Sequence, residues 1–136
     1  AAAAPVADVY VDACEPPHCY ARAKRVMVLT SRNTFGAAER LVLALRELPR
    51  VTVVGERTSG HVATVRDARL VRKSWFVEFA ADDVVAVGGE RAEARGVRPD
   101  IELAQDFNAL RAGTDNVLER ALDELLLATT LQLAAL

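Results

Sequence analysis

The stretch between residues 25 and 55 constrains the fold more than any other part of the sequence. Residues 25–30 form a continuous apolar run, which is typical of a strand buried on both faces of a parallel sheet. Apolar residues then recur at three- and four-residue spacings over 35–48, which predicts a helix that ends at Pro49. Residues 51–55 form a second β-branched run. A buried strand on each side of a helix favours parallel pairing, so the unit predicts an α/β fold with a partly parallel sheet and packed helices.

Shorter elements are predicted after this unit. Runs of β-branched and aromatic residues indicate strands at 63–70, 75–79 and 84–87. Trp75 and Phe76 fit the pattern of a strand rather than of a ligand site, and we expect them in a core or an interface.

The chain is expected to finish with a long helix. A brief strand at 101–103 precedes it, and either Thr114 or Asp115 is a suitable N-cap. Apolar residues follow at helical spacing. Because the stretch 127–136 is apolar nearly all round, it should pack against a partner chain or another part of its own protein.

Charge and hydropathy exclude two classes of partner. Seventeen basic and nineteen acidic residues give a net charge of −2, whereas a nucleic-acid-binding domain would be strongly basic. No apolar run reaches the roughly 18–20 residues that span a bilayer. Residues 1–5 lack the basic and apolar regions of a signal peptide. The sequence predicts no cofactor, and we expect residues 1–24 to be a linker or lead-in segment.

Two cysteines lie close together, Cys14 and Cys19, with two prolines and His18 between them. The stiff turn could bring the thiols together as a disulfide, which would imply an oxidising compartment, or they could remain free. A zinc site is the least favoured reading, because zinc prefers four ligands at wider spacings and no second Cys/His cluster exists. We therefore predict no metal site.

The junction at residues 29–39 delivers a strand into the start of a helix. Such a turn lies at the carboxyl edge of a parallel sheet, where the sites of α/β proteins collect. The unbonded N–H groups at a helix start can also stabilise an oxyanion. The junction is therefore a good position for a nucleophile.

Four motifs in this order resemble the tail-specific, or C-terminal-processing, serine protease family, in its tricorn-like and interphotoreceptor-retinoid-binding-like branch. They match the family patterns LTSRxTFSAAE, VVGExTxG, GVxPDI and GxDxxLxxAL, and they lie at 29–39, 53–60, 96–101 and 113–122. The resemblance implies that residues 25–136 are the C-terminal half of a catalytic domain with a crotonase/ClpP-like spiral core. It also implies serine-type peptide hydrolysis at protein C-termini and an extracytoplasmic location.

The departures from the family bear on activity. The family's nucleophilic serine lies three residues before the motif's glutamate, and Gly36 holds that position. Glycine has no oxygen with which to attack a carbonyl. The lysine of one branch corresponds to His61, whereas the glutamate of the tricorn-like branch is retained as Glu93. The resemblance places the oxyanion donors at Gly36 and Ala37.

Each of these residues also has a simpler interpretation. Gly36 could be a glycine at a helix start where two elements pack closely. His61 could be a solvated histidine in a loop, and Glu93 could be a solvated charge on the surface. Thr34 is a conceivable substitute nucleophile, but its role as an N-cap is favoured.

Three functions follow from the sequence: a protease-family domain that is silent because of Gly36, a binding module for an apolar small molecule or a peptide, and a self-associating structural domain. The family's first strand and N-terminal half are not recognisable here, so we expect a fragment that pairs with such a half or forms a homo-oligomer.

Overall fold

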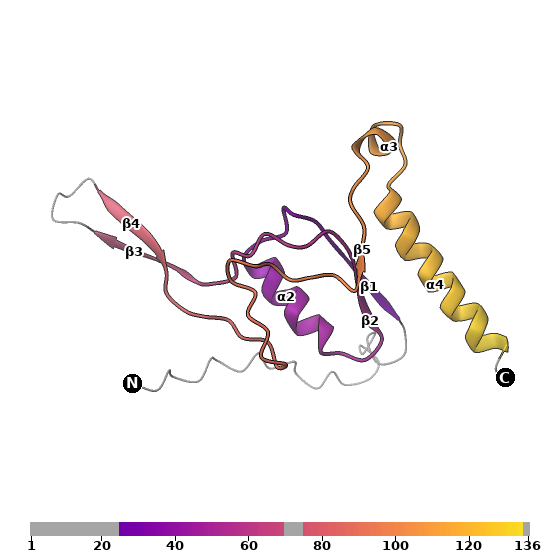
Figure 1. The fold of residues 1–136 in the computed structure, drawn as a ribbon, viewed down its shortest axis with the longest axis horizontal. Coiled ribbons are helices and arrows are strands. Elements are labelled where there is room, and N and C mark those ends of the chain that lie inside the picture. The colour runs from indigo at the N-terminus through magenta and orange to yellow at the C-terminus, as the bar shows by residue number, and fades with distance from the viewer. Residues whose placement is uncertain (1–24, 70–74, 135–136) are drawn as a thin grey trace, which may run out of the picture.

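The computed structural model describes residues 25–69 and 75–134, with a central body between a projecting hairpin and a long helix (Figure 1). The elements in chain order are β1 (Val26–Thr30), α2 (Ala37–Arg46), β2 (Val51–Gly55), β3 (Val65–Arg69), β4 (Phe76–Ala80), β5 (Ile101–Glu102), α3 (Phe107–Arg111) and α4 (Asn116–Ala134).

The central sheet is parallel, as the sequence predicts. Its strand order is β1-β2-β5, and both pairings are parallel. Val28 lies opposite Val53, and Val54 lies opposite Ile101. β1, α2 and β2 therefore form the predicted strand–helix–strand unit, and the protein is a mixed α/β domain.

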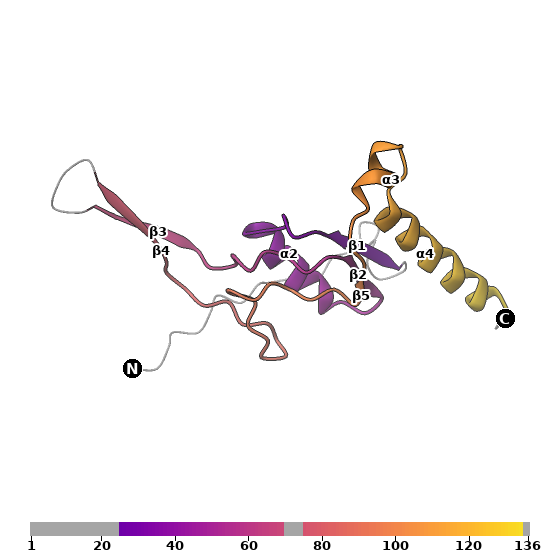
Figure 2. The ribbon, with the colours of Figure 1, turned by 45° about the horizontal axis from the view of Figure 1, so that its top comes forward.

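Helices pack on both faces of this sheet (Figure 2). Adjacent residues of a strand point to opposite faces, and Val53 and Val54, both fully buried, belong to different clusters. Val53 packs in a cluster with Val42 and Leu43 of α2. Val54 packs in a cluster with Val117 and Ala121 of α4. The result is three layers, with the sheet between α2 and α4.

One predicted helix is shorter than expected, one predicted strand was wrong, and one short helix was missed. The helix predicted over 35–48 is confined to α2, because Gly36 has a positive φ and residues beyond Arg46 form a turn. The strand predicted at 84–87 is only one bridge, between Val85 and Arg91, because a tight turn brings the chain back at once. The short helix α3 was not predicted; Asp106 caps it by accepting from two backbone N–H groups.

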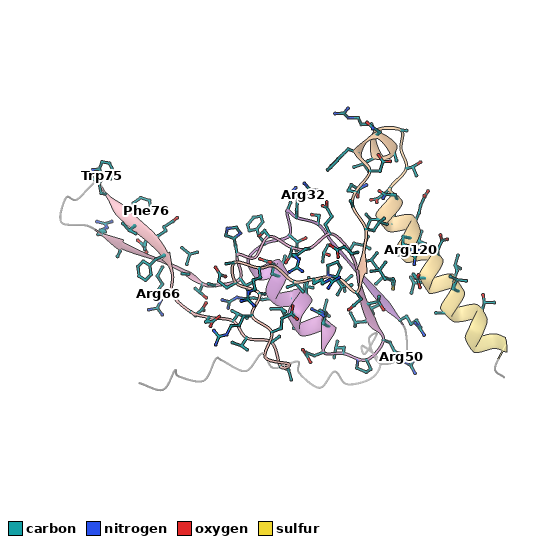
Figure 3. All side chains as sticks on the ribbon, in the orientation of Figure 1. Arg32, Arg50, Arg66, Trp75, Phe76 and Arg120 are labelled. Carbon is teal, nitrogen blue, oxygen red and sulfur yellow. The ribbon has the colours of Figure 1, made fainter. Side chains whose placement is uncertain are left out.

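The hairpin of β3 and β4 extends away from the body (Figures 1 and 3). All of its strand residues are exposed. Trp75 and Phe76, at the outer end, are 66% and 61% exposed, so the core alternative is wrong, whereas the interface alternative stays a prediction.

The start of α4 is confirmed at the predicted cap. Asp115 Oδ1 accepts hydrogen bonds from the N–H groups of Val117 and Leu118, both at 3.1 Å. No helix in the described part of the chain is both long and apolar enough to span a bilayer. Cys14, His18 and Cys19 lie outside the described residues.

Candidate functional site

The turn that joins β1 to α2 is held by its own polar side chains. Ser31 N–H donates to Thr34 Oγ1 at 3.0 Å, and Asn33 N–H donates to Ser31 Oγ at 3.2 Å. The N-cap of α2 is Gly36, which has no side chain to cap the helix. The prediction that Thr34 is the N-cap is therefore wrong, because its hydroxyl is used two residues before the cap, within the turn.

Gly36 combines an unusual backbone with unoccupied space. Its φ of +62° and ψ of −126° lie in a region that side chains rarely adopt. No heavy atom lies within 4 Å of the position that a Cβ would take, neighbours in the chain aside. A side chain at this position would therefore cause backbone strain but would meet no steric obstacle.

The two predicted oxyanion donors differ in their bonding. Gly36 N–H donates to the carbonyl oxygen of His61 at 2.9 Å. Ala37 N–H, the first of α2, has no acceptor among the described residues. A helix start leaves such donors available, so Ala37 is the better placed of the two for an incoming anion.

Glu39 is a buried carboxylate that holds the loop carrying His61, and this role was not predicted from the sequence. Its side chain is fully buried. Its carboxylate accepts hydrogen bonds from the Thr58 hydroxyl, from Gly60 N–H at 2.8 Å and from His61 N–H at 2.9 Å. Buried charges need such partners. The signal was available: Glu39 lies three and four residues before Val42 and Leu43, on the apolar side of α2.

Glu93 holds the next part of the same loop. Its Oε2 accepts from Val62 N–H at 2.8 Å and from Ala63 N–H at 2.7 Å. The described structure gives no bond between this carboxylate and the His61 ring. The structure thus brings Glu93 to the histidine's loop, where it positions the backbone rather than the imidazole.

Asp82 is the third carboxylate that accepts hydrogen bonds from the backbone of this loop. Its Oδ1 accepts from Thr64 N–H at 2.6 Å, and its Oδ2 accepts from the Thr64 hydroxyl. Arg40 of α2 donates to Asp82 and, through Nε, to Val62 O at 2.9 Å. Three carboxylates therefore accept five successive backbone N–H groups, those of residues 60–64. We call residues 58–64 the clamped loop.

The clamped loop brings His61 to the strand-to-helix turn. Besides the bond between His61 O and Gly36, Ser59 N–H donates to Thr34 O at 3.0 Å. The His61 ring is exposed, and its Nδ1 lies 3.0 Å from Ser59 Oγ. The predicted residues Gly36, Ala37, His61 and Glu93 are thus neighbours around one loop, although their predicted catalytic roles stay predictions.

The GVxPDI motif, residues 96–101, contacts the clamped loop. Thr58 Oγ1 accepts from Val97 N–H at 2.7 Å, so the Thr58 hydroxyl links Glu39 to the motif. Asp100 Oδ2 accepts from Val53 N–H at 2.8 Å, and Arg32 donates its backbone N–H and its guanidinium to Glu56. The carboxylates of Glu56 and Asp100 are therefore structural. No group of three metal-ligating side chains occurs within residues 25–69 and 75–134.

Hydrogen bonds from Thr64, and to a lesser degree Arg40, lower the pKa of Asp82. A carboxyl group whose pKa is lower when folded stabilises the fold above its unfolded pKa, and this contribution disappears as pH falls through the folded value. The unperturbed pKa of an aspartate is about 3.9. The stabilisation that the Asp82 carboxylate provides should therefore persist down to this pH and be lost only below it.

Thr64→Val should raise the Asp82 pKa toward its ordinary value, because the hydroxyl bond is the largest cause of the shift. A carboxyl-carbon NMR titration of Asp82 measures this directly. Thr114→Val, on the loop before α4, is the matched control and should leave the titration unchanged. An unaltered Asp82 titration in Thr64→Val would show that the hydroxyl does not hold the carboxylate.

Comparisons with known proteins show the family of this chain and its likeness to solved structures. The model of peptidase family S41 matches residues 7–103. A protein from Parabacteroides merdae, solved as a candidate peptidase, is 34% identical with a TM-score of 0.69, over 76% of this chain and 32% of that protein. The photosystem II D1 C-terminal processing protease is 29% identical with a TM-score of 0.51, over 60% of this chain and 21% of that enzyme.

The tricorn protease shares the fold at 20% identity, with a TM-score of 0.59 over 74% of this chain and 10% of its own. This chain thus spans about a third or less of the length of these three proteins.

Proposed function

We propose that this chain, which belongs to peptidase family S41, is a family domain that does not hydrolyse peptide bonds. The observation that carries the proposal is Gly36 at the entry to α2. The family's serine position here has no oxygen, so no acyl-enzyme can form at it. The parallel β1-β2-β5 sheet between two helices supports a crotonase/ClpP-like spiral core.

The surroundings of position 36 remain organised. The clamped loop is fixed by Glu39, Glu93 and Asp82, and Ala37 N–H is unbonded within the described structure. The loop and the helix start are held in place, but the site has no attacking atom. We therefore propose that the site binds a protein C-terminus, the substrate class of the family, and releases it uncut. An extracytoplasmic location is part of the same proposal.

The test is hydrolysis of a fluorogenic, unstructured peptide with a free C-terminus. The unmodified chain should release fluorophore no faster than buffer does, and Gly36→Ala should behave identically because neither residue carries a nucleophile. Turnover by the unmodified chain that survives repeated purification would refute the silence of the site.

Self-association is a second candidate function, favoured by α4. Leu118, Leu122 and Leu126 repeat every fourth residue and are 44%, 48% and 66% exposed. Residues at this spacing share one side of a helix, and the side that packs on the sheet is a different one, carrying Val117 and Ala121. An exposed leucine row of this kind is typical of a helix–helix interface.

The double variant Leu122→Glu/Leu126→Glu should shift the chain from a dimer or larger oligomer to a monomer in sedimentation velocity. Leu110→Glu is the matched control, because Leu110 of α3 is also 44% exposed but lies off this row. If the unmodified chain sediments as a monomer across a hundredfold concentration range, α4 does not mediate self-association.

A further inference from the structure

The hydroxyl of Ser59, in the clamped loop, lies beside a potential base, the imidazole of His61. Ser59 Oγ lies 3.0 Å from His61 Nδ1, within the roughly 2.6–3.2 Å expected between a nucleophile and its base. No other hydrogen bond to this hydroxyl occurs among the described residues. In the VVGExTxG motif, residue 59 is the variable position between threonine and glycine, so the resemblance assigns it no role.

The backbone fixes this pair in place. Ser59 N–H is bonded to Thr34 O, and His61 N–H is bonded to the buried Glu39 carboxylate. Between them, Gly60 has a φ of +82°, and a Cβ there would lie 2.7 Å from Gly96 N. Gly60 therefore lies tightly against a neighbouring segment, while its two flanking side chains meet. Such preorganisation limits the freedom that a nucleophile and its base would otherwise lose on reaction.

We propose that Ser59 and His61 form a nucleophile–base dyad that reacts with activated acyl and phosphonyl groups. His61 Nδ1 takes the hydroxyl proton as Ser59 Oγ forms a bond to the carbonyl carbon. The carbon–oxygen bond to an aryl oxide then breaks, and the proton leaves with that group. Water, deprotonated by the same nitrogen, hydrolyses the acyl-serine and restores the hydroxyl. The required tautomer carries its proton on Nε2.

The leaving group sets the scope of this chemistry. An aryl oxide or fluoride departs without strong assistance, whereas a peptide amine must be protonated as its bond breaks. The His61 ring has no carboxylate partner among the described residues to orient it and to stabilise its protonated form, so the substrates of the dyad are aryl esters and fluorophosphonates rather than peptides. The reaction is thus separate from the proposed silence at Gly36.

The experiment is labelling with a fluorophosphonate, followed by peptide mass mapping. We expect adduct on Ser59 in the unmodified chain and none in Ser59→Ala. His61→Gln keeps a hydrogen-bonding side chain but removes the base, and it should slow labelling at least tenfold, since general bases contribute about 10²–10⁴-fold. Ser31→Ala, the matched control, should label like the unmodified chain, because no imidazole of residues 25–69 and 75–134 contacts Ser31 Oγ.

Thermal unfolding of each variant shows whether it is folded, and the substitutions leave the backbone bonds of the loop in place. Absence of adduct on Ser59, or equal labelling rates in His61→Gln and the unmodified chain, would overturn the proposal.

Discussion

Glu39→Ala is expected to lower the free energy of unfolding by roughly 3–5 kcal/mol. The substitution leaves the Thr58 hydroxyl and the N–H groups of Gly60 and His61 without their acceptor. Each buried donor left unpaired costs about 1–3 kcal/mol, and entering water recovers part of the sum. Urea unfolding followed by circular dichroism measures the change.

Two companion variants separate the carboxylate from its surroundings. Glu39→Gln keeps the size but turns an amide NH₂ toward a donor, so we expect a smaller loss of about 1–3 kcal/mol. Glu47→Ala, at the exposed end of α2, should change stability by no more than about 0.5 kcal/mol. If Glu39→Ala is no more destabilising than Glu47→Ala, the clamped loop does not depend on the buried carboxylate.

Gly96→Ala is expected to destabilise the domain by roughly 3–5 kcal/mol or to prevent folding. A Cβ at this position would lie 2.0 Å from Thr58 O, and the φ of +74° adds strain of about 1–2 kcal/mol. Overpacking against a fixed backbone adds about 1–3 kcal/mol, occasionally more. The glycine of the GVxPDI motif is thus required because the motif lies directly against the clamped loop.

Gly113→Ala is the matched control for this substitution. Its φ of +93° is also positive, but no heavy atom lies within 4 Å of its Cβ position, so only the strain of about 1–2 kcal/mol applies. The two variants are compared by urea unfolding and by soluble yield. Equal stability of the two would mean that the close approach of Gly96 to Thr58 is not rigid.

Local patterns predicted the framework of the fold well. The apolar runs at 25–30 and 51–55 and the helical spacing between them are local signals, and they became β1, β2 and α2. The cap at Asp115 was equally local. The strand predicted at 84–87 is only a single bridge at Val85. β propensity does not indicate where the chain forms a tight turn, and the turn here ends the pairing after one residue pair.

The site was only partly predictable. The family resemblance singled out Gly36, His61 and Glu93 as site positions, and the structure places all three around the clamped loop. The role of Glu39 depends on Thr58 and Gly60, which lie 19 and 21 residues further along the chain. Long-range hydrogen bonds of this kind leave no periodic trace. The Glu93 carboxylate likewise accepts from backbone N–H groups 30 and 31 residues earlier in the chain.

We propose that Gly36 occupies the position of a lost nucleophile in a site whose loop and helix start are otherwise held in place. Open space at its Cβ position makes Gly36→Ser sterically feasible, while its backbone conformation adds strain of about 1–3 kcal/mol. Gly36→Ala carries the same strain without an oxygen and is the control.

The decisive measurement is fluorophosphonate labelling of Gly36→Ser, with adducts located by peptide mapping and folding checked by thermal unfolding. We predict a new adduct at position 36, within the peptide that contains residues 33–40, and none there in Gly36→Ala or the unmodified chain. A folded Gly36→Ser variant that takes no label at position 36 would contradict the account.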